Sequence, residues 1–140
     1  MKINVQQNCL NIDWNLVPQI LELVGMGFHE ASLHQKAFEN SSSVIFIYDE
    51  SKLIGFGRAI SDGAYQAAIY DVAVLPEYQG KGIGKLIVDK IVTSLPGFNF
   101  ILYASPGKEL FYEKQNFRKL KTGMGLFINA ERMKNKGMIE

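Results

Sequence analysis

The stretch that decides the fold is a strand that leads through a glycine-rich turn into a helix, and it reads Asp71-Val72-Ala73-Val74-Leu75-Pro76-Glu77-Tyr78-Gln79-Gly80-Lys81-Gly82-Ile83-Gly84-Lys85. Pro76 ends the strand because proline cannot donate a ladder hydrogen bond. Glycines at such a turn let backbone N–H groups approach a ligand closely, and the start of the helix adds the positive end of its dipole. This combination predicts a binding site for a phosphate or pyrophosphate.

Two common nucleotide-binding motifs do not fit this turn. A dinucleotide fingerprint that begins at Gly80 needs a third glycine at position 85, which is lysine. A Walker A loop that ends at Gly84-Lys85 needs glycine at position 79 and Ser or Thr at position 86, where Gln79 and Leu86 stand. Both motifs are therefore excluded.

Outward from this turn, alternation of apolar residues predicts strands and helical spacing predicts helices. The predicted strands are Lys2–Val5, Val44–Tyr48, Leu53–Ile60, Gln66–Leu75, a buried strand at Phe98–Ala104, and Met124–Asn129. The predicted helices are one capped by Asp13 that stops near Gly25–Gly27, then Ala31–Phe38, Ile83–Leu95 and Lys108–Gln115. One strand–helix–strand crossover in an otherwise antiparallel series predicts the α/β (α+β) class, with a mixed, mostly antiparallel sheet and helices on both faces.

Length and composition fit one folded domain. The chain has 140 residues, of which 47% are hydrophobic and 21% charged, and this places it outside the range of disordered chains. We predict a single domain over residues 1–140, with a loose C-terminal tail at 131–140. The net charge is +1 and no basic run is interleaved with aromatic residues, so a nucleic-acid partner is disfavoured.

The number of cysteines and the length of the apolar runs indicate in which cellular compartment the protein is expected. Cys9 is the only cysteine, so an intramolecular disulfide is excluded and a thiolate zinc site would lack ligands. This predicts a reducing, cytoplasmic compartment. The longest apolar runs, Val44–Tyr48 and Phe100–Ala104, are far shorter than the roughly 20 residues that cross a bilayer. We predict neither a membrane span nor an export signal.

Gln79, Gly82 and Gly84 match a Q/R-x-x-G-x-G/A signature, and with it the chain resembles the GNAT N-acetyltransferase superfamily. The resemblance continues along most of the chain. Leu53–Arg58 is similar to the third strand of that family, Asp71–Pro76 to its fourth strand, and Leu110–Phe117 to its late FYEKxGF motif. The resemblance implies a GNAT-like sheet that splays between its fourth and fifth strands to admit acetyl-CoA.

The resemblance also implies roles for individual residues. Acetyl-CoA would be the cosubstrate, and an amine would attack its thioester directly in a ternary complex. Tyr112 would assist departure of the CoA thiolate. Contacts to the cofactor would come from the fourth strand, which pairs with pantetheine, and from the turn, which binds the pyrophosphate: Val72, Ala73, Val74, Gln79, Gly80, Lys81, Gly82, Ile83, Gly84 and Lys85.

The general base is left open by the sequence. Ala68 stands where some family members carry a carboxylate or a histidine that acts as the base, and Asn116 stands where the family usually has glycine. Asp71 is a candidate base or a carboxylate that tunes another group's pKa, yet strand alternation sends its side chain to the face opposite Tyr70 unless a bulge intervenes. His29 and the other histidine of the chain lack a matching carboxylate in the pattern of a metal site, so we predict no metal.

Three functions remain compatible with the sequence. The best supported is an N-acetyltransferase that acts on a primary amine, and the others are a non-catalytic CoA-binding module and a transferase that uses a longer acyl-CoA. A small-molecule amine is favoured over a protein as acceptor. Its pocket is expected at Gly25–His34 and Lys121–Phe127. Family members are often homodimers, and the sequence identifies no interface.

Overall fold

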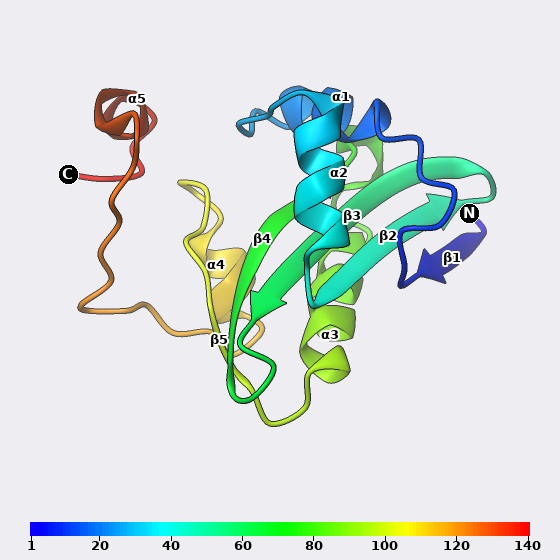
Figure 1. The fold of residues 1–140 in the computed structure, drawn as a ribbon. Helices are drawn as coiled ribbons and strands as arrows, with labels where there is room; N and C mark the ends of the chain where they lie inside the picture. The colour runs from blue at the N-terminus through cyan, green and yellow to red at the C-terminus, as the bar shows by residue number, and fades with distance from the viewer. The chain divides into compact units, whose positions relative to one another are not determined.

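The computed structural model describes residues 1–140 as two units, Met1–Leu102 and Tyr103–Glu140, and each is described by itself (Figure 1). The first unit contains β1 Ile3–Gln6, α1 Leu16–Leu23, α2 Ala31–Glu39, β2 Ser43–Asp49, β3 Lys52–Ser61, β4 Gln66–Val74, the 3-10 helix η1 Pro76–Tyr78, α3 Ile83–Ser94 and β5 Asn99–Ile101. The second unit contains α4 Glu109–Glu113 and α5 Ala130–Asn135. None of these helices is long and apolar enough to cross a bilayer.

The sheet is mixed, as predicted. Its strands follow the order β1-β2-β3-β4-β5. Strands β1 to β4 run antiparallel to one another, and β5 runs parallel to β4. Helix α3 forms the crossover between β4 and β5 and lies on one side of the sheet, with α1 and α2 on the other (Figure 1). The predicted arrangement of helices on both faces is therefore confirmed.

Two glycines of β3 let α3 pack directly on the sheet. A Cβ atom at Gly57 would lie 2.7 Å from Cγ2 of Ile87 and 3.3 Å from Cδ1 of Ile91, and both isoleucines are fully buried. Gly55 faces the same helix, with Ile87 Cδ1 at 3.3 Å from its built Cβ. The missing side chains in β3 make room for the apolar stripe of α3.

The opposite face of the sheet carries an aromatic core. Phe38 of α2 packs against Phe46 of β2 and Phe56 of β3, with ring centroids 5.3 Å and 5.8 Å away, and all three side chains are fully buried. Trp14, which precedes α1, adds a further ring 5.8 Å from Phe38. Such aromatic pairs stabilise the fold beyond their buried area, so this cluster fixes α2 over β2 and β3.

A β-bulge interrupts β4 in the middle of its pairing with β3. Arg58 pairs with Tyr70 and Phe56 pairs with Ala73, so two residues of β4 stand opposite Gly57 alone. The first of the two, Asp71, has a φ of +59°, in the left-handed region that few residues other than glycine, asparagine and aspartate adopt. The extra residue reverses the alternation of side chains along the rest of the strand.

Strand β5 is much shorter than its neighbour β4 and pairs with it over only three residues. β5 pairs only with Gln66, Ala67 and Ala68, while β4 continues to Val74. The remainder of β4, residues 69–74, therefore has an edge that β5 does not cover. The splay between the fourth and fifth strands, which the resemblance implies, stays a prediction.

Several predicted elements differ from the structure. Met124–Asn129 is not a strand, because an apolar alternating segment becomes one only with a partner for its ladder hydrogen bonds. The predicted buried strand at Phe98–Ala104 shrinks to Asn99–Ile101, and its residues are only partly buried or exposed. The N-cap of α1 is Asn15, whereas the sequence predicted Asp13. The Asp13 carboxylate instead accepts a hydrogen bond from the backbone N–H of Asn15, before the helix begins.

The close packing of α3 on β3 makes Gly57→Ala a test of the fold. Its new Cβ would overlap a methyl group of Ile87, so α3 must shift, and we expect a loss of about 1–3 kcal/mol of unfolding free energy. Denaturant unfolding followed by circular dichroism measures it. Gly123→Ala is the control, since its Cβ would meet nothing closer than 3.5 Å. Equal stability of the two variants would contradict the packing described here.

Candidate functional site

The glycine-rich turn between β4 and α3 has the open geometry that the sequence predicts. Gly80 and Gly82 have φ values of +76° and +83°, and Gly82 is the N-cap of α3. A Cβ built at either glycine meets no atom within 4 Å, so the space beside the backbone is clear. The turn therefore presents backbone, rather than side chains, to whatever approaches it.

The backbone N–H groups of this turn are available to bind an anion. Those of Gly80, Lys81, Gly82, Ile83 and Gly84 donate to no acceptor in the chain, and they stand at the N-terminus of a helix of 12 residues. Helix dipole and unpaired donors together favour a negatively charged group. The Ile83 side chain is buried, which fixes the start of the helix while its N–H stays available.

The side chains around the turn make specific contacts. Gln79 Nε2 donates to the Val74 carbonyl at 2.9 Å and ties the turn to the end of β4. Lys85 Nζ forms an ion pair with Asp89 at 2.7 Å on the exposed surface of α3, and Lys81 Nζ lies 5.6 Å from the centre of the Tyr78 ring. Gln79 thus helps to hold the turn in place, while the two lysines contact Tyr78 and Asp89.

At alternate residues of β4, the backbone N–H and carbonyl groups point away from β3, toward the open edge of the strand. Leu75 N–H donates to Ile54 O, toward β3, so Val74 directs its own N–H and carbonyl away from β3. Val72 has the same orientation two residues earlier, and Ala73 between them pairs with Phe56 of β3. The side chains of Val72 and Val74 turn toward α3, near Gly57 and Gly55 respectively. Outward hydrogen-bonding groups therefore lie on the edge that leads to the glycine turn.

Asp71 forms an ion pair with Arg58 across the bulge. Arg58 Nε donates to Asp71 Oδ2 at 2.8 Å, and only 16% and 21% of the two side chains are exposed. The guanidinium also lies over the rings of Phe38 and Tyr70, at 5.6 Å and 5.2 Å. Asp71 and Tyr70 therefore share one face, because the bulge overrides the alternation expected for a regular strand.

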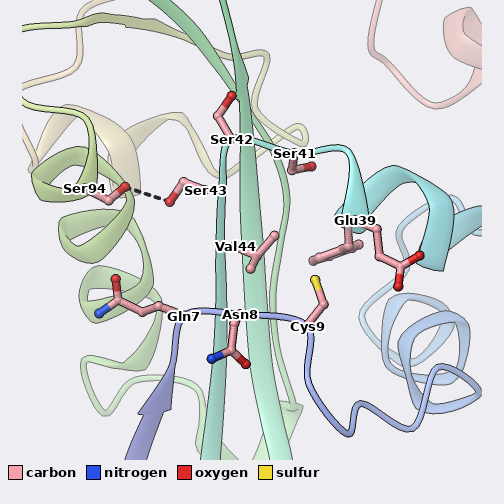
Figure 2. Close-up of a pocket in the computed structure, with 10 residues that line it drawn as sticks. Gln7, Asn8, Cys9, Glu39, Ser41, Ser42, Ser43, Val44 and Ser94 are labelled. Carbon is pink, nitrogen blue, oxygen red and sulfur yellow. Dashed lines mark hydrogen bonds between the residues drawn. The ribbon is translucent and has the colours of Figure 1, made fainter. Parts of the chain in front are cut away.

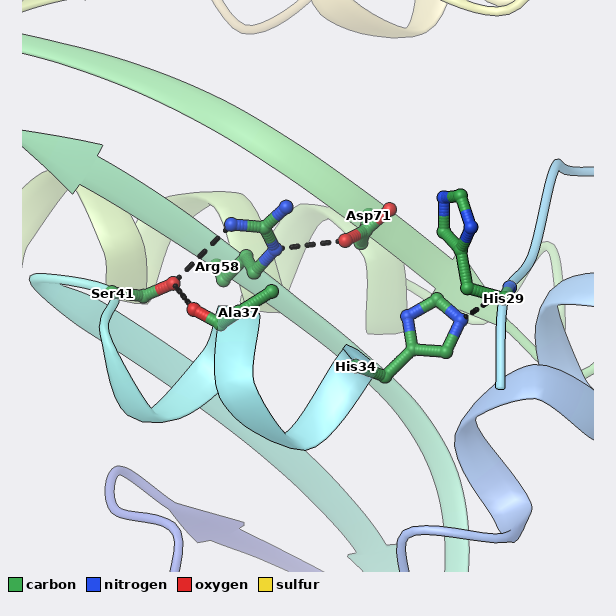
Figure 3. A network of polar contacts seen from close by, with 6 residues as sticks. All are labelled: His29, His34, Ala37, Ser41, Arg58 and Asp71. Carbon is green, nitrogen blue, oxygen red and sulfur yellow. Dashed lines mark hydrogen bonds and ion pairs between the residues drawn. The ribbon is translucent and has the colours of Figure 1, made fainter. Parts of the chain in front are cut away.

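Arg58 is the residue of this site that the sequence interpretation missed. The available signal was a charged residue within an otherwise apolar strand, Leu53–Ile60, which requires a partner of opposite charge when it is buried. Its Nη1 also contacts Ser41 Oγ at 3.4 Å (Figure 3). Arg58 thereby links α2, β3 and the bulge.

The two histidines lie next to this ion pair. The His29 backbone N–H donates to Nε2 of His34 at 2.8 Å, and the two rings are 5.6 Å apart (Figure 3). Burial lowers the pKa of His34, while the charge of Asp71 acts in the opposite direction. No group of three or more residues of the His, Cys, Asp or Glu types is arranged to hold a metal ion.

Tyr112 belongs to the second unit. It lies in α4, and its ring contacts those of Phe111 and Phe117 edge-on, at 4.9 Å and 5.6 Å. Burial raises the pKa of Tyr112, so its hydroxyl stays protonated at neutral pH. Asn116 just after the helix has a φ of +72°, which confirms that it replaces glycine in a left-handed helix end.

A hollow of about 420 Å³ lies at the C-terminal end of α3, away from the glycine turn (Figure 2). It is lined mainly by polar side chains, and Ser43 and Ser94 join hydroxyl to hydroxyl across it at 2.7 Å. A helix of 12 residues separates it by about 18 Å from the glycine turn. Cys9 points into it, and burial followed by the Glu39 charge raises the pKa of its thiol, so no reactive thiolate is present there.

Comparisons with known proteins agree with this geometry. Residues 40–119 match the family described as acetyltransferase (GNAT) domain. The uncharacterized N-acetyltransferase ycf52 of Pyropia yezoensis is 33% identical over 125 residues, which cover 84% of this chain and 72% of that protein. Serotonin N-acetyltransferase 2, chloroplastic, of Oryza sativa is 28% identical over 81% of this chain and 60% of its own length.

A solved structure with a similar fold comes from meticillin-resistant Staphylococcus aureus. It is described as a protein of unknown function and probable acetyltransferase, and it is 26% identical to this chain. Its TM-score is 0.78, with 90% of this chain and 98% of that chain covered. The likeness thus extends over nearly the whole length of both proteins.

Proposed function

Because this chain belongs to the GNAT acetyltransferase family, we propose that it is an acetyl-CoA-dependent N-acetyltransferase whose acceptor is a primary amine. The observation that carries the proposal is the row of free backbone donors from Gly80 to Gly84, placed at the end of the open edge of β4. An anion site next to an uncovered strand edge suits a ligand with a pyrophosphate at one end and an amide-containing arm.

The residues present fit acetyl-CoA at this site. Bare glycine backbone at positions 80 and 82 leaves room for a pyrophosphate against the N–H groups, and Gly84 and Ile83 add donors at the first turn of α3. Lys81 and Lys85 supply positive charge nearby, although Asp89 offsets part of it at Lys85. The outward N–H and carbonyl of Val72 and the outward N–H of Val74 can hydrogen-bond to the amides of pantetheine, with Ala73 between them, whereas the Val74 carbonyl already accepts from Gln79.

Direct transfer needs few groups from the protein. When bound, acetyl-CoA supplies an acetyl thioester, whose carbonyl carbon is the electrophile. A backbone N–H of the outward β4 edge can polarise that carbonyl, in the way that a preorganised oxyanion donor does. Holding both reactants in one site converts the encounter into an effectively unimolecular step. Cys9 is not required, because no acyl-enzyme forms in direct transfer.

Tyr112 is our candidate for the group that protonates the departing thiolate. Its hydroxyl is a hydrogen-bond donor, and burial keeps it in the protonated form. Asp71 is the second candidate catalytic residue. Since Arg58 holds one of its carboxylate oxygens, a role in tuning the charge of the acceptor side fits Asp71 better than proton abstraction.

A small amine is the preferred acceptor over a protein. The rice relative is named for serotonin, a small amine, which supports this choice without identifying the acceptor of this chain. The experiment that tests the function is a panel of primary amines, including an arylalkylamine and a lysine peptide, with release of free CoA as the readout.

The panel separates the proposed function from its alternatives. We expect CoA release with acetyl-CoA and at least one amine. Binding of acetyl-CoA without turnover on any amine would instead indicate a non-catalytic CoA-binding module. Faster turnover with propionyl-CoA or longer acyl-CoAs would indicate a different acyl donor.

Gly82→Ala tests the anion site. A methyl group at this position faces the ligand side of the turn, so we expect the acetyl-CoA Kd to rise at least tenfold, a loss of about 1.4 kcal/mol in binding. Gly63→Ala is the matched control: Gly63 has a φ of +75° and equally open surroundings, but lies in the β3–β4 turn. Both variants carry similar backbone strain of about 1–3 kcal/mol. Calorimetric titration should show weaker binding only in Gly82→Ala.

Tyr112→Phe tests the proton donor. The change removes the hydroxyl and keeps the ring contacts with Phe111 and Phe117, so stability and acetyl-CoA affinity should stay unchanged. An interaction made only in the transition state lowers kcat and kcat/KM together. We expect kcat to fall about 100-fold, the low end for general acid catalysis. Full activity in a correctly folded variant would show that water protonates the thiolate.

A further inference from the structure

His29 lies in the loop between α1 and α2, and its position is set by His34. The His34 side chain is only 4% exposed, and its Nε2 accepts the His29 backbone N–H at 2.8 Å. The two imidazole rings lie 5.6 Å apart. The loop is therefore fastened to α2 at the one residue of the loop that carries an imidazole.

The same contact determines which histidine can accept a proton. A nitrogen that accepts a hydrogen bond is unprotonated, so neutral His34 carries its hydrogen on Nδ1. Its acceptor nitrogen is occupied by the backbone, and its burial opposes a positive charge. His34 is thus poorly suited to take a proton from a substrate, whereas the imidazole of His29 is exposed and no hydrogen bond holds either of its ring nitrogens.

Both histidines lie beside the bulge of β4. Asp71 is close enough for its charge to act on His34, and Figure 3 shows its second carboxylate oxygen, the one not held by Arg58, directed toward the side where His29 lies. The charged and titratable groups that act on His34 are Asp71 of β4, Arg58 of β3 and His29 itself, and Asp71 and Arg58 are already paired with each other. A carboxylate beside an imidazole stabilises the imidazolium that forms when the ring takes up a proton.

His29, His34 and Asp71 lie away from the glycine turn where the cofactor is proposed to bind, on the side from which an acceptor amine could enter. The glycine turn stands beyond Val74, at one end of the open edge of β4, and the bulge stands further back along that edge. The histidines approach the bulge from the face of the sheet that carries α2, whereas α3 covers the other face (Figure 1). An amine that enters from the α2 side would reach the edge of β4 next to His29.

We propose that His29 is the general base that accepts the proton of the acceptor amine, and that His34 is the residue that positions it. As the amine nitrogen bonds to the acetyl carbon and the carbon–sulfur bond breaks, one N–H proton moves to the imidazole of His29. The thiolate that leaves is protonated by Tyr112 or water, and His29 returns its proton to the solvent. This inference rests on the proposed function and assigns the base that Ala68 does not supply.

His29→Ala tests the base. We expect kcat to fall about 100-fold, the acidic limb of the kcat–pH profile to disappear, and added imidazole to restore part of the rate. The acetyl-CoA Kd, measured by calorimetry, should not change, because the glycine turn is intact. Lys36→Ala, an exposed change on α2, is the control and should keep the wild-type rate and profile.

His34 is tested by two replacements. His34→Gln keeps an oxygen that can accept the His29 N–H and should retain most of kcat, whereas His34→Leu removes the acceptor and should lower kcat with the acetyl-CoA KM unchanged. In the free protein, the NMR amide resonance of His29 should shift strongly only in His34→Leu. Thermal melts establish that each variant is folded.

The outcomes separate this inference from the proposed function. If wild-type protein releases no CoA with any amine, the proposed function fails and His29 fails with it. If wild-type protein is active and His29→Ala keeps its rate and its acidic limb, only the assignment of His29 is overturned. A His29→Ala variant with a raised amine KM and an unchanged kcat profile would also overturn it, because it would indicate a binding role.

Discussion

The ion pair between Arg58 and Asp71 is the constraint on which the arrangement of the site depends. It is held at 2.8 Å, mostly out of solvent, with the guanidinium between the rings of Phe38 and Tyr70. Asp71 occupies a left-handed backbone conformation that costs about 1–3 kcal/mol where nothing compensates it. The ion pair stabilises the bulge in which that conformation occurs. Loss of either partner would leave a half-buried charge unpaired as well as a strained residue.

The bulge in turn sets the orientation of everything beyond it. One extra residue in β4 shifts the alternation, so that Val72 and Val74 direct their side chains toward α3 and their backbone groups toward the open edge. Gln79 then hydrogen-bonds to the carbonyl of Val74 and fixes the start of the glycine turn. A single polar contact between β3 and β4 is thus linked, through the bulge and the end of β4, to the glycine turn at the start of α3.

Local patterns were enough to predict most of the helices and strands and the glycine turn, and long-range contacts account for what was missed. Turn glycines and helical spacing are local, so the glycine turn, α3 and the β2–β3 hairpin were predicted correctly. A bulge depends on a partner strand, and neither Arg58 nor its contact with Asp71 follows from spacing along the chain. The segment Met124–Asn129 has the alternation of a strand but gains no ladder partner, and the sequence does not encode that lack.

The glycine turn and the bulge of β4 are built from different groups, so they differ in how far the sequence alone identifies them. The anion end is built from backbone N–H groups, which glycines leave bare, so its ligand class can be inferred from a short motif and the fold. The end at the bulge is built from side chains that four segments bring together: the His29 loop, α2, β3 and the bulge of β4. A backbone site of this kind depends on a few neighbouring glycines, whereas the cluster at the bulge depends on residues that are distant from one another in the sequence. The glycine turn can therefore be recognised in the sequence, while the cluster at the bulge is visible only in the folded chain.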